Sequence, residues 1–466
     1  MAESANALTS APSVPVVPAA GQGSRTAPGA AGLHEIVVVG GGAAGLQLAT
    51  QLGDKLGRRG KARVTLVDRS RTHIWKPLLH EVAAGSMDVG HHAVDYLAQA
   101  HRHHFGYRIG EMIALDREKK EVCVAASRDL EGAEVTPPRS FRYDTLVIAV
   151  GSRSNDFGTP GVAQHAISLD TPDEAERFHQ RLVNACIRAH AQPGPVRPGQ
   201  LHVTIIGAGA TGTELAAELH RTAREVISHG LDRIDPERDF KLTLVEASDR
   251  ILPALPARIS ENVHRSLQAL GIDVRTKAKV TEVSGEGVRL VDGELIPSEL
   301  VVWAAGVRGP DVLADLGGLE VTRSNQLVVT PMLQTTRDPN VFAIGDCAFL
   351  KYEGQERPVP PRAQAAHQQA SHLVKQMRRR LEGKPLQPFV YKDFGSLVSL
   401  GHYTAIGNLM GFVGGKNLFI EGILARLMYR SLYQMHQRAL HGAPKTALDT
   451  TARFLTRGTS PRVKLH

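Results

Sequence analysis

The chain has few cysteines and no long apolar run, and both shortages limit what it can be. Its three cysteines, Cys123, Cys186 and Cys347, lie far apart and form no C-x-x-C pair. This spacing argues against a disulfide framework, a thiol-bound metal and an oxidising compartment, so we expect no metal site. No stretch reaches the ~18 consecutive apolar residues that cross a bilayer, and we therefore expect no spanning helix.

Charge is scarce at the start of the chain. Residues 1–33 are rich in Ala, Pro, Ser and Gly and contain one acid, Glu3, and one base, Arg25. Such a segment cannot bury enough apolar surface to fold, so we predict a disordered tail. It also lacks the basic start and apolar middle of a signal peptide.

The full length of 466 residues leaves room for roughly three domains of ~150 residues.

One glycine pattern, G-x-G-x-x-G, occurs twice, each time after an apolar strand and at the start of a helix. The glycines are Gly40, Gly42 and Gly45 in IVVVGGGAAGLQLAT, and Gly207, Gly209 and Gly212 in VTIIGAGATGTELAAEL. The first glycine permits a tight turn, the second lets the backbone approach a pyrophosphate, and the third brings helix and strand together. Each copy therefore indicates a dinucleotide-binding unit.

An acid follows each copy at the end of the next apolar strand, placed to bond the ribose of a dinucleotide. Asp68 lies 28 residues after Gly40, and Glu246 lies 39 residues after Gly207. Both intervals exceed the usual ~20, so longer helices or inserted loops are expected. A further apolar strand closes each half at a glycine, Gly151 or Gly306. We therefore predict an α/β protein with two Rossmann-like domains.

Two dinucleotides in one chain usually mean hydride transfer from a nicotinamide to a flavin. The segment VFAIGDCA places Asp346 after a strand, where it can bond the flavin's ribityl or phosphate region; the alternative is an N-cap. The prolines of PVPPRAQAAHQQA predict a helix starting near Arg362. Gln364, His367 and Gln368 would share one face of it, suited to a polar ring or carbonyl, or simply to solvent.

Nearly all of the positive charge lies at the carboxyl end. Residues 402–466 contain nine Lys or Arg and two acids, a net +7 out of +8 for the whole chain. Within 420–442, Leu424, Met428, Leu432 and Met435 share a helical face opposite Arg and Gln side chains. This pattern favours an anionic lipid surface over nucleic acid, although the helix could instead pack on the body or on a partner subunit.

The chain resembles the type II NADH:quinone oxidoreductases from about residue 33 to its end. The matching stretches are HIWKPLLHEVAAGSMD (73–88), YDTLVIAVGSRSNDFGTPGV (143–162), DRILPALPARIS (249–260), PPRAQAAHQQA (360–370), YKDFGSLVSL (391–400) and IEGILARLMYRSLYQMHQRALHG (420–442). The resemblance implies domains at 34–165 (FAD, first part), 166–325 (NADH), 326–390 (FAD, second part) and 391–466 (membrane association), after the tail at 1–33.

The same resemblance implies roles for individual residues. The FAD site is expected at Gly40, Gly42, Gly45, Asp68, Gly151 and Asp346, and the NADH site at Gly207, Gly209, Gly212, Glu246 and Gly306. Glu214 matches a residue near the nicotinamide with a role in hydride or proton transfer; the alternative is a carboxylate that favours the positive end of its helix. Gln364, His367 and Gln368 match the helix between flavin and quinone.

Other matches are weaker. Lys416 resembles a lysine near the quinone in some relatives, but a solvated surface lysine fits as well. His80 and Glu81 resemble the segment that approaches the flavin, or they are residues at a helix start. No thiol stands near this segment, so electrons are expected to pass directly from flavin to a diffusible acceptor.

The resulting hypothesis is a FAD-dependent enzyme that oxidises NADH and reduces membrane quinone, ubiquinone or menaquinone, without pumping protons. It would be a peripheral protein on the cytoplasmic face of the cell membrane, with a homodimer possible. Glu214, Gln364 and His367 are its candidate catalytic residues, and Glu246 would repel the 2′-phosphate of NADPH. A membrane-peripheral redox sensor binding FAD and NADH, and a soluble NADH oxidase, remain alternatives.

Overall fold

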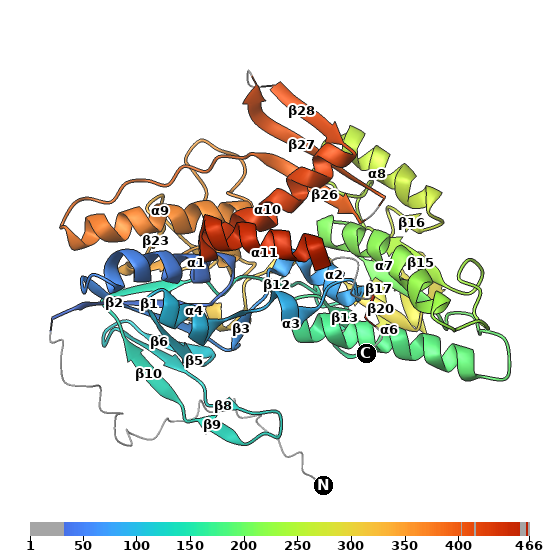
Figure 1. The fold of residues 1–466 in the computed structure, drawn as a ribbon, viewed down its shortest axis with the longest axis horizontal. Helices are drawn as coiled ribbons and strands as arrows, with labels where there is room; N and C mark the ends of the chain where they lie inside the picture. The colour runs from blue at the N-terminus through green and yellow to red at the C-terminus, as the bar shows by residue number, and fades with distance from the viewer. Residues whose placement is uncertain (1–31, 402, 414–415, 457–462, 465–466) are drawn as a thin grey trace, which may run out of the picture. The chain divides into compact units, whose positions relative to one another are not determined.

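The computed structural model describes residues 32–401, 403–413, 416–456 and 463–464. The chain divides into Met1–Leu33 and His34–His466, and only the second unit is considered below (Figure 1). The tail predicted at 1–33 therefore lies, apart from its last two residues, outside the described part of the chain.

A six-stranded sheet forms the centre of the first half, with the strand order β23-β24-β11-β1-β2-β5. Its strands are β1 (His34–Val39), β2 (Ala62–Asp68), β5 (Gly106–Ile109), β11 (Thr145–Ile148), β23 (Gln334–Thr335) and β24 (Asp338–Ala343). All neighbours are parallel except β23 and β24. Parallel strands covered on both faces read as continuous apolar runs, as the VVV and TLVI segments here do.

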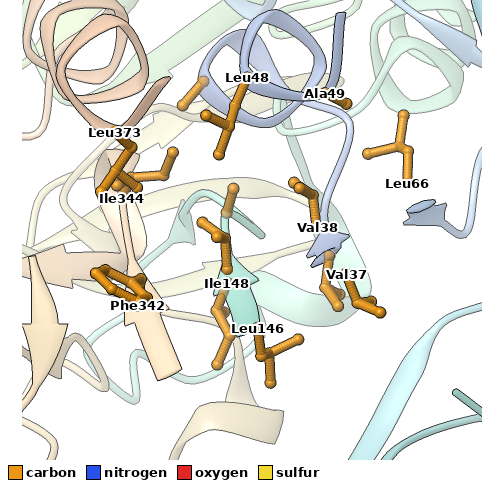
Figure 2. Packing of buried hydrophobic residues seen from close by; sticks show 14 of the residues in the cluster. Val37, Val38, Leu48, Ala49, Leu66, Leu146, Ile148, Phe342, Ile344 and Leu373 are labelled. Carbon is orange, nitrogen blue, oxygen red and sulfur yellow. The ribbon is translucent and has the colours of Figure 1, made fainter. Parts of the chain in front are cut away.

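Two helices cover one face of this sheet. They are α1 (Ala43–Leu52) and α9 (Ala363–Leu381), which lie against each other although they are far apart in sequence. Figure 2 shows side chains of β1, β11 and β24, among them Val38, Ile148 and Phe342, gathered with Leu48 of α1 and Leu373 of α9. The strand β24 and the helix α9 come from the late part of the chain, so the first domain is built from two separate segments.

The second half repeats the plan with a five-stranded parallel sheet, in the order β13-β20-β14-β15-β16. Its strands are β13 (Ala166–Ser168), β14 (His202–Ile206), β15 (Lys241–Val245), β16 (Asp273–Arg275) and β20 (Leu300–Trp303). Its helices are α6 (Pro172–Ala191), α7 (Ala210–Ser228) and α8 (Ala257–Ala269). The start of α6 is fixed by a capping box between Thr171 and Glu174. The long helix α7 accounts for part of the wide interval between Gly207 and Glu246.

Short elements complete the two halves. Around the first sheet lie α2 (Leu79–Ala83), α3 (Val89–His92), α4 (Tyr96–Arg102), β3 (Thr72–His73), β4 (Val94–Asp95), β6 (Met112–Asp116), β7 (Glu121–Val124), β8 (Ser127–Arg128), β9 (Glu134–Thr136) and β10 (Arg139–Arg142). Later come β12 (Arg153–Ser154), α5 (Val162–His165), β17 (Val280–Ser284), β18 (Gly287–Leu290), β19 (Leu295–Pro297), β21 (Val307–Arg308), β22 (Leu327–Val328) and β25 (Ala348–Phe349).

The two chain segments that connect the halves, here called the crossings, lie side by side. The chain leaves the first domain through β12 and returns through β21, and these two strands pair antiparallel, with Ser154 opposite Val307. After the return, Leu313, Leu316 and Leu319 are buried in the core of the first domain. The chain is thus back in the first domain before residue 325, where the sequence placed the boundary, because these leucines fit the first core.

The carboxyl-terminal region is a three-stranded antiparallel sheet followed by two helices, shown in red tones in Figure 1. The elements are β26 (Gly395–Leu400), β27 (Thr404–Val413), β28 (Lys416–Glu421), α10 (Ile423–His441) and α11 (Ala443–Thr456). Val398, Leu400 and Ile406 belong to the core of the second domain, whereas Leu440 of α10 belongs to that of the first. The region therefore packs against both dinucleotide-binding domains.

Helix α10 faces the body with the side that contains Tyr429, Tyr433 and the buried His436. On the opposite side, Leu424 and Leu427 are each 57% exposed, whereas Leu440 near the end of the helix is buried in the first core. Part of the apolar side of α10 is therefore exposed, whereas an ordinary surface helix buries its apolar stripe. Among the described residues, no helix is long and apolar enough to cross a membrane.

Candidate functional site

The first glycine loop leads from β1 into α1, and its three glycines differ in their surroundings. Gly40 has a φ of +99°, a conformation that favours glycine, and a Cβ there would overlap the Ala149 carbonyl. A Cβ on Gly45 would overlap the carbonyl of Gly40, so only glycine lets helix and strand approach this closely. A Cβ on Gly42 would meet only the Ala149 oxygen, at 4.0 Å. The middle glycine thus faces open space.

The second loop, between β14 and α7, repeats this arrangement. Gly207 has a φ of +102°, and a Cβ on Gly212 would overlap its carbonyl. A Cβ on Gly209 would meet no described atom within 4 Å. Neither α1 nor α7 has a side-chain cap or an acid in its first turn. Each helix therefore presents uncapped N–H groups and the positive end of its dipole to an open loop, which suits a pyrophosphate.

The two acids are placed equivalently. The Asp68 carboxylate accepts a hydrogen bond from the N–H of Gly41 at 2.6 Å and from Ser70 at 2.7 Å. The Glu246 carboxylate accepts one from the N–H of Ala208 at 2.8 Å and from Ser248 at 2.9 Å. Each acid therefore holds the middle of its own glycine loop. Carboxylate oxygens have further lone pairs, which remain able to accept ribose hydroxyls.

The closing glycines lie directly before the crossings between the halves. Gly151 has a φ of +73° and Gly306 a φ of +65°, so each turns the chain at the end of its strand. They lead into β12 and β21, the paired strands of the crossing. The two predicted closing glycines thus lead into one pair of strands, although no local sequence pattern indicated this pairing.

Asp346 lies inside a short 3-10 turn, Gly345–Cys347, whose N-cap is Ile344. Its role as an N-cap is therefore not observed. Its carboxylate accepts a hydrogen bond from the Ser152 hydroxyl at 3.0 Å. Burial raises the pKa of Asp346, and the nearby Lys76 ammonium opposes this shift. The acid predicted for the flavin is thus joined to the residue after Gly151.

Sequence reasoning missed Lys76 as part of this group. Its ammonium donates to the Ser152 carbonyl at 2.8 Å and lies 3.0 Å from the Asp170 carboxylate. It stands in the stretch HIWKPLL, which carried the family resemblance, but nothing in its local pattern distinguished it from a surface lysine. The thiol of Cys347 is buried in the first core, and burial raises its pKa to about 12, so it is unreactive.

Helix α9 begins at Ala363 with Arg362 as its N-cap, as predicted. The Gln364 amide donates to the Gly395 carbonyl at 3.0 Å, and the Gln368 amide to the Lys392 carbonyl at 2.8 Å. Both glutamines therefore hold the chain segment that leads into β26. His367 is half-buried, which lowers its pKa. The three residues share one face of α9, but the two glutamine side chains already have protein partners.

Glu214 is buried at the start of α7, where three elements meet. Its carboxyl group accepts a hydrogen bond from the N–H of Ser399 at 3.0 Å and interacts with the Tyr429 hydroxyl. His80 Nδ1 of α2 lies 3.6 Å from its other oxygen. Burial raises the pKa of Glu214 to about 8, since the hydrogen bonds from Ser399 and Tyr429 offset it only in part.

The partner of Glu214 is uncharged at neutral pH. Burial lowers the pKa of His80 to about 4, and its Nδ1 donates to the Pro77 carbonyl at 2.9 Å. The 3.6 Å contact is therefore a neutral one and not an ion pair. Both His80 and Glu81 lie in the short helix α2, as one of the two sequence readings expected. The side chain of Lys416 lies outside the described part of the chain.

Comparison with known proteins identifies the family. A model of the pyridine nucleotide-disulphide oxidoreductases matches residues 34–370. The Type II NADH:quinone oxidoreductase of Haemophilus influenzae is 44% identical over 446 residues, which cover 93% of this chain and all of that protein. The chain belongs to the type II NADH:quinone oxidoreductases. The corresponding protein of Mycobacterium tuberculosis is 28% identical over 91% of this chain and 88% of its own length.

Solved structures agree on the fold. NDH2 from Plasmodium falciparum in complex with RYL-552 has a TM-score of 0.77 at 18% identity, covering 93% of this chain and all of that one. The sulfide:quinone oxidoreductase of Aquifex aeolicus has a TM-score of 0.67 at 16% identity, covering 91% and 95% of the two chains. The α/β dinucleotide-binding fold expected from the sequence is thereby confirmed, and the relative of 44% identity confirms the family resemblance.

Proposed function

We propose that this chain carries FAD on its first glycine loop and NADH on its second, and passes the electrons of NADH to a quinone. The enzyme class follows from family membership: the chain is a FAD-dependent NADH:quinone oxidoreductase, rather than a redox sensor or a soluble NADH oxidase. The observation that carries the residue assignment is the pair of open loops at Gly42 and Gly209, each with its own acid.

The residues present fit both dinucleotides. Gly42 and the uncapped start of α1 would receive the pyrophosphate of FAD, and Asp68 its ribose, with Asp346 near the flavin. Gly209, the start of α7 and Glu246 would hold NADH in the same way. When bound, FAD supplies a two-electron carrier that takes hydride from NADH. The protein orients the two nucleotides and excludes water between them.

Glu214 is the group best placed to deliver a proton. Its carboxyl group is buried and carries its proton at neutral pH, because burial raises its pKa to about 8. A general acid is most useful when its pKa lies near the working pH. We assign Glu214 to proton delivery during quinone reduction. Gln364, His367 and Gln368 are assigned to the acceptor side, where the glutamines fix the segment 392–395 beside it.

Purified protein tests this function directly. We expect a yellow protein with a flavin absorption band and NADH oxidation that depends on an added short-chain quinone. A long-lived reduced flavin that quinones fail to reoxidise would support the sensor instead. Equal rates with oxygen alone and with quinone would support the oxidase.

The exposed face of α10 is proposed as the membrane-docking surface, defined by Leu424, Leu427, Leu432 and Met435, which are between 38% and 57% exposed. A helix that packs only on the body would bury these side chains and expose its polar ones. Here the tyrosines and His436 face the body instead. The +7 charge of residues 402–466 adds attraction to anionic headgroups. Since NADH is supplied inside the cell, we place the protein on the cytoplasmic face of the cell membrane.

Charged substitutions test the docking surface. Leu424→Glu/Leu427→Glu should abolish sedimentation with vesicles that contain anionic lipid, while activity with a water-soluble quinone persists. The matched control is Leu130→Glu/Val135→Glu, which places the same charges on exposed apolar positions of the β8–β9 region. If the wild type is a dimer in solution and the α10 variant a monomer with unchanged vesicle binding, the face serves a homodimer instead.

A further inference from the structure

One face of α7 carries a row of ionisable side chains that starts at Glu214. The row continues with Glu218, Arg221 and Glu225, at spacings of four, three and four residues, which place them on one side of a helix. Their side-chain exposures rise along the helix, from 6% and 7% at the two buried glutamates to 17% at Arg221 and 23% at Glu225. The row therefore leads from the buried carboxyl group of Glu214 to the surface.

Glu218 is held firmly in this row. Arg221 donates to its carboxylate at 2.6 Å and to Glu225 at 2.8 Å. The Ser86 hydroxyl also interacts with the Glu218 carboxylate. A Cβ on Gly401, in the turn after β26, would overlap the second Glu218 oxygen, so glycine leaves room for the carboxylate there. The Glu218 carboxylate therefore lies where α7 meets the end of α2 and the turn after β26.

His80 fills the space between the two glutamates. It is buried, its Nδ1 lies 3.6 Å from the Glu214 carboxyl group, and its ring also interacts with Glu218. Tyr429 of α10 interacts with both glutamates as well. Glu81 of α2 completes the group. The buried cluster formed by Glu214, Glu218, His80, Glu81 and Tyr429 thus joins three helices.

The first domain shows what these positions look like without this cluster. Two and six residues after the last glycine of the first loop stand Gln47 and Gln51, where the second copy has Glu214 and Glu218. The amide of Gln47 donates to the Ser371 hydroxyl at 2.9 Å. The helix position therefore needs a polar group for packing, but it does not need an acid. Carboxyl groups at both positions occur only in the second copy.

The reaction requires a supply of protons from solvent. NADH releases two electrons and one proton as hydride and becomes NAD+, whereas a quinone takes two electrons and two protons to become a quinol. One proton per turnover must therefore come from solution. A buried donor that gives up this proton has to be protonated again before the next turnover.

We propose that Glu218 is the positioning residue through which Glu214 regains its proton from solvent, along the row of ionisable side chains on α7 and past His80. This inference rests on the proposed function, in which Glu214 delivers the proton. Each step moves one proton: Glu214 gives its proton to the quinone, the Glu218 carboxylate takes one from solvent, and Glu218 hands it to the Glu214 carboxylate.

The pKa values of the two glutamates favour proton transfer from Glu218 to Glu214. Burial would raise the pKa of Glu218, but hydrogen bonds from Arg221 and Ser86 more than offset this and leave it below its usual value. Burial raises the pKa of Glu214 to about 8. A proton therefore moves downhill from Glu218 to Glu214. Burial and the Glu218 carboxylate raise the pKa of Glu81 to about 7, against the opposing charges of Arg430 and Arg221.

The test compares Glu218→Gln with Glu237→Gln in FAD-loaded protein. Glu237 is a matched control, because it also pairs with an arginine of α7, Arg224 at 2.8 Å, but stands outside the buried cluster. The first readout needs no turnover: after transfer to D2O, infrared spectra follow exchange of the proton on the buried Glu214 carboxyl group, assigned by its absence in Glu214→Gln. We expect exchange at least about 10-fold slower in Glu218→Gln and unchanged in Glu237→Gln.

The second readout separates the two half-reactions. Flavin reduction by NADH should keep its rate in Glu218→Gln, while quinone-dependent reoxidation slows by about 10-fold and recovers as the pH is lowered. Glu218→Asp, which keeps the acid, should restore most of the rate. Exchange as fast in Glu218→Gln as in Glu237→Gln, or equal losses in both half-reactions, would overturn the inference. If the wild type itself fails to reduce quinone, the proposed function fails instead.

Discussion

The two dinucleotide-binding halves share a backbone plan and differ in the chemistry placed on it. In both, a positive-φ glycine begins the loop, a third glycine touches the first, and an acid holds the loop's middle N–H. The next turn of helix then differs, with Gln47 in the first half and Glu214 in the second. The backbone is fixed by close packing, so side chains that line the open space are where the halves can diverge.

A second difference is how each site is completed. The first half needs Asp346 and α9, which arrive after the chain has passed through the whole second domain. Ser152 joins Asp346 to the end of the β11 strand by a 3.0 Å hydrogen bond. The sheet of the second half is built from one continuous stretch, from β13 to β20. The FAD-binding half is thus assembled from segments far apart in sequence, whereas the sheet of the NADH-binding half forms from neighbouring segments.

The largest expected effect comes from blocking each open loop in turn. Gly42→Val should give a folded but colourless protein, and Gly209→Val a yellow protein whose flavin is reduced by NADH at least ~100-fold more slowly, a change of ~2.7 kcal/mol. Both positions have negative φ and open space around a Cβ, so folding should survive. Absorption spectra and stopped-flow reduction measure this; a yellow Gly42→Val protein would contradict the assignment.

Exchanging the helix residues of the halves should change the pH dependence of stability. Between its ordinary pKa of 4.5 and about 8, Glu214 holds a proton when folded that it releases when unfolded, so the free energy of unfolding falls as pH rises through this window. Glu214→Gln should remove a fall on the order of 4 kcal/mol between ~pH 5 and ~pH 9. Urea unfolding at several pH values measures it.

The reverse exchange is its control. Gln47→Glu puts a carboxyl group in a fully buried place beside Ser371, so the protein should lose on the order of 3 kcal/mol at high pH and less at low pH. If both variants show the wild-type pH dependence of stability, a buried carboxyl group at these two helix positions does not control it.

A smaller effect is expected on the choice of nicotinamide. Glu246→Gln removes the charge that repels a 2′-phosphate, so the preference for NADH over NADPH should fall by about 10-fold. The ratio of kcat/KM values for the two reductants gives this number. Asp68→Asn in the first half is the comparison, because it should leave the ratio as in the wild type while weakening retention of FAD.

The smallest effect should come from the hydrogen bond between Ser152 and Asp346 in the first half. Ser152→Ala removes the hydrogen bond to Asp346, which is worth about 1 kcal/mol, or ~5-fold in the dissociation constant of FAD. Titration of flavin-free protein with FAD measures it. A loss as large as that of Gly42→Val would mean that Ser152 supports the fold of the site rather than Asp346 alone.

Local patterns predicted the parts whose geometry is local. The glycine loops, the strand ends at Asp68 and Glu246 and the start of α9 after Arg362 follow from spacing and from proline. The amphipathic α10 was also predictable, but its orientation was not, since a hydrophobic stripe looks the same whether it faces a core or a lipid surface. Lys76 and Ser152 gave no signal, because their partners lie far away in sequence.

The sequence alone therefore determined that two dinucleotide loops exist, because backbone conformation at a glycine and the reach of an acid at a strand end are settled within a few residues. Only the tertiary structure decided that Glu214, Glu218, His80 and Tyr429 come together, and that Leu424, Leu427 and Leu432 of α10 stay exposed. The acidity of a buried group depends on which distant charges and dipoles surround it, and that is known only once the domains have packed.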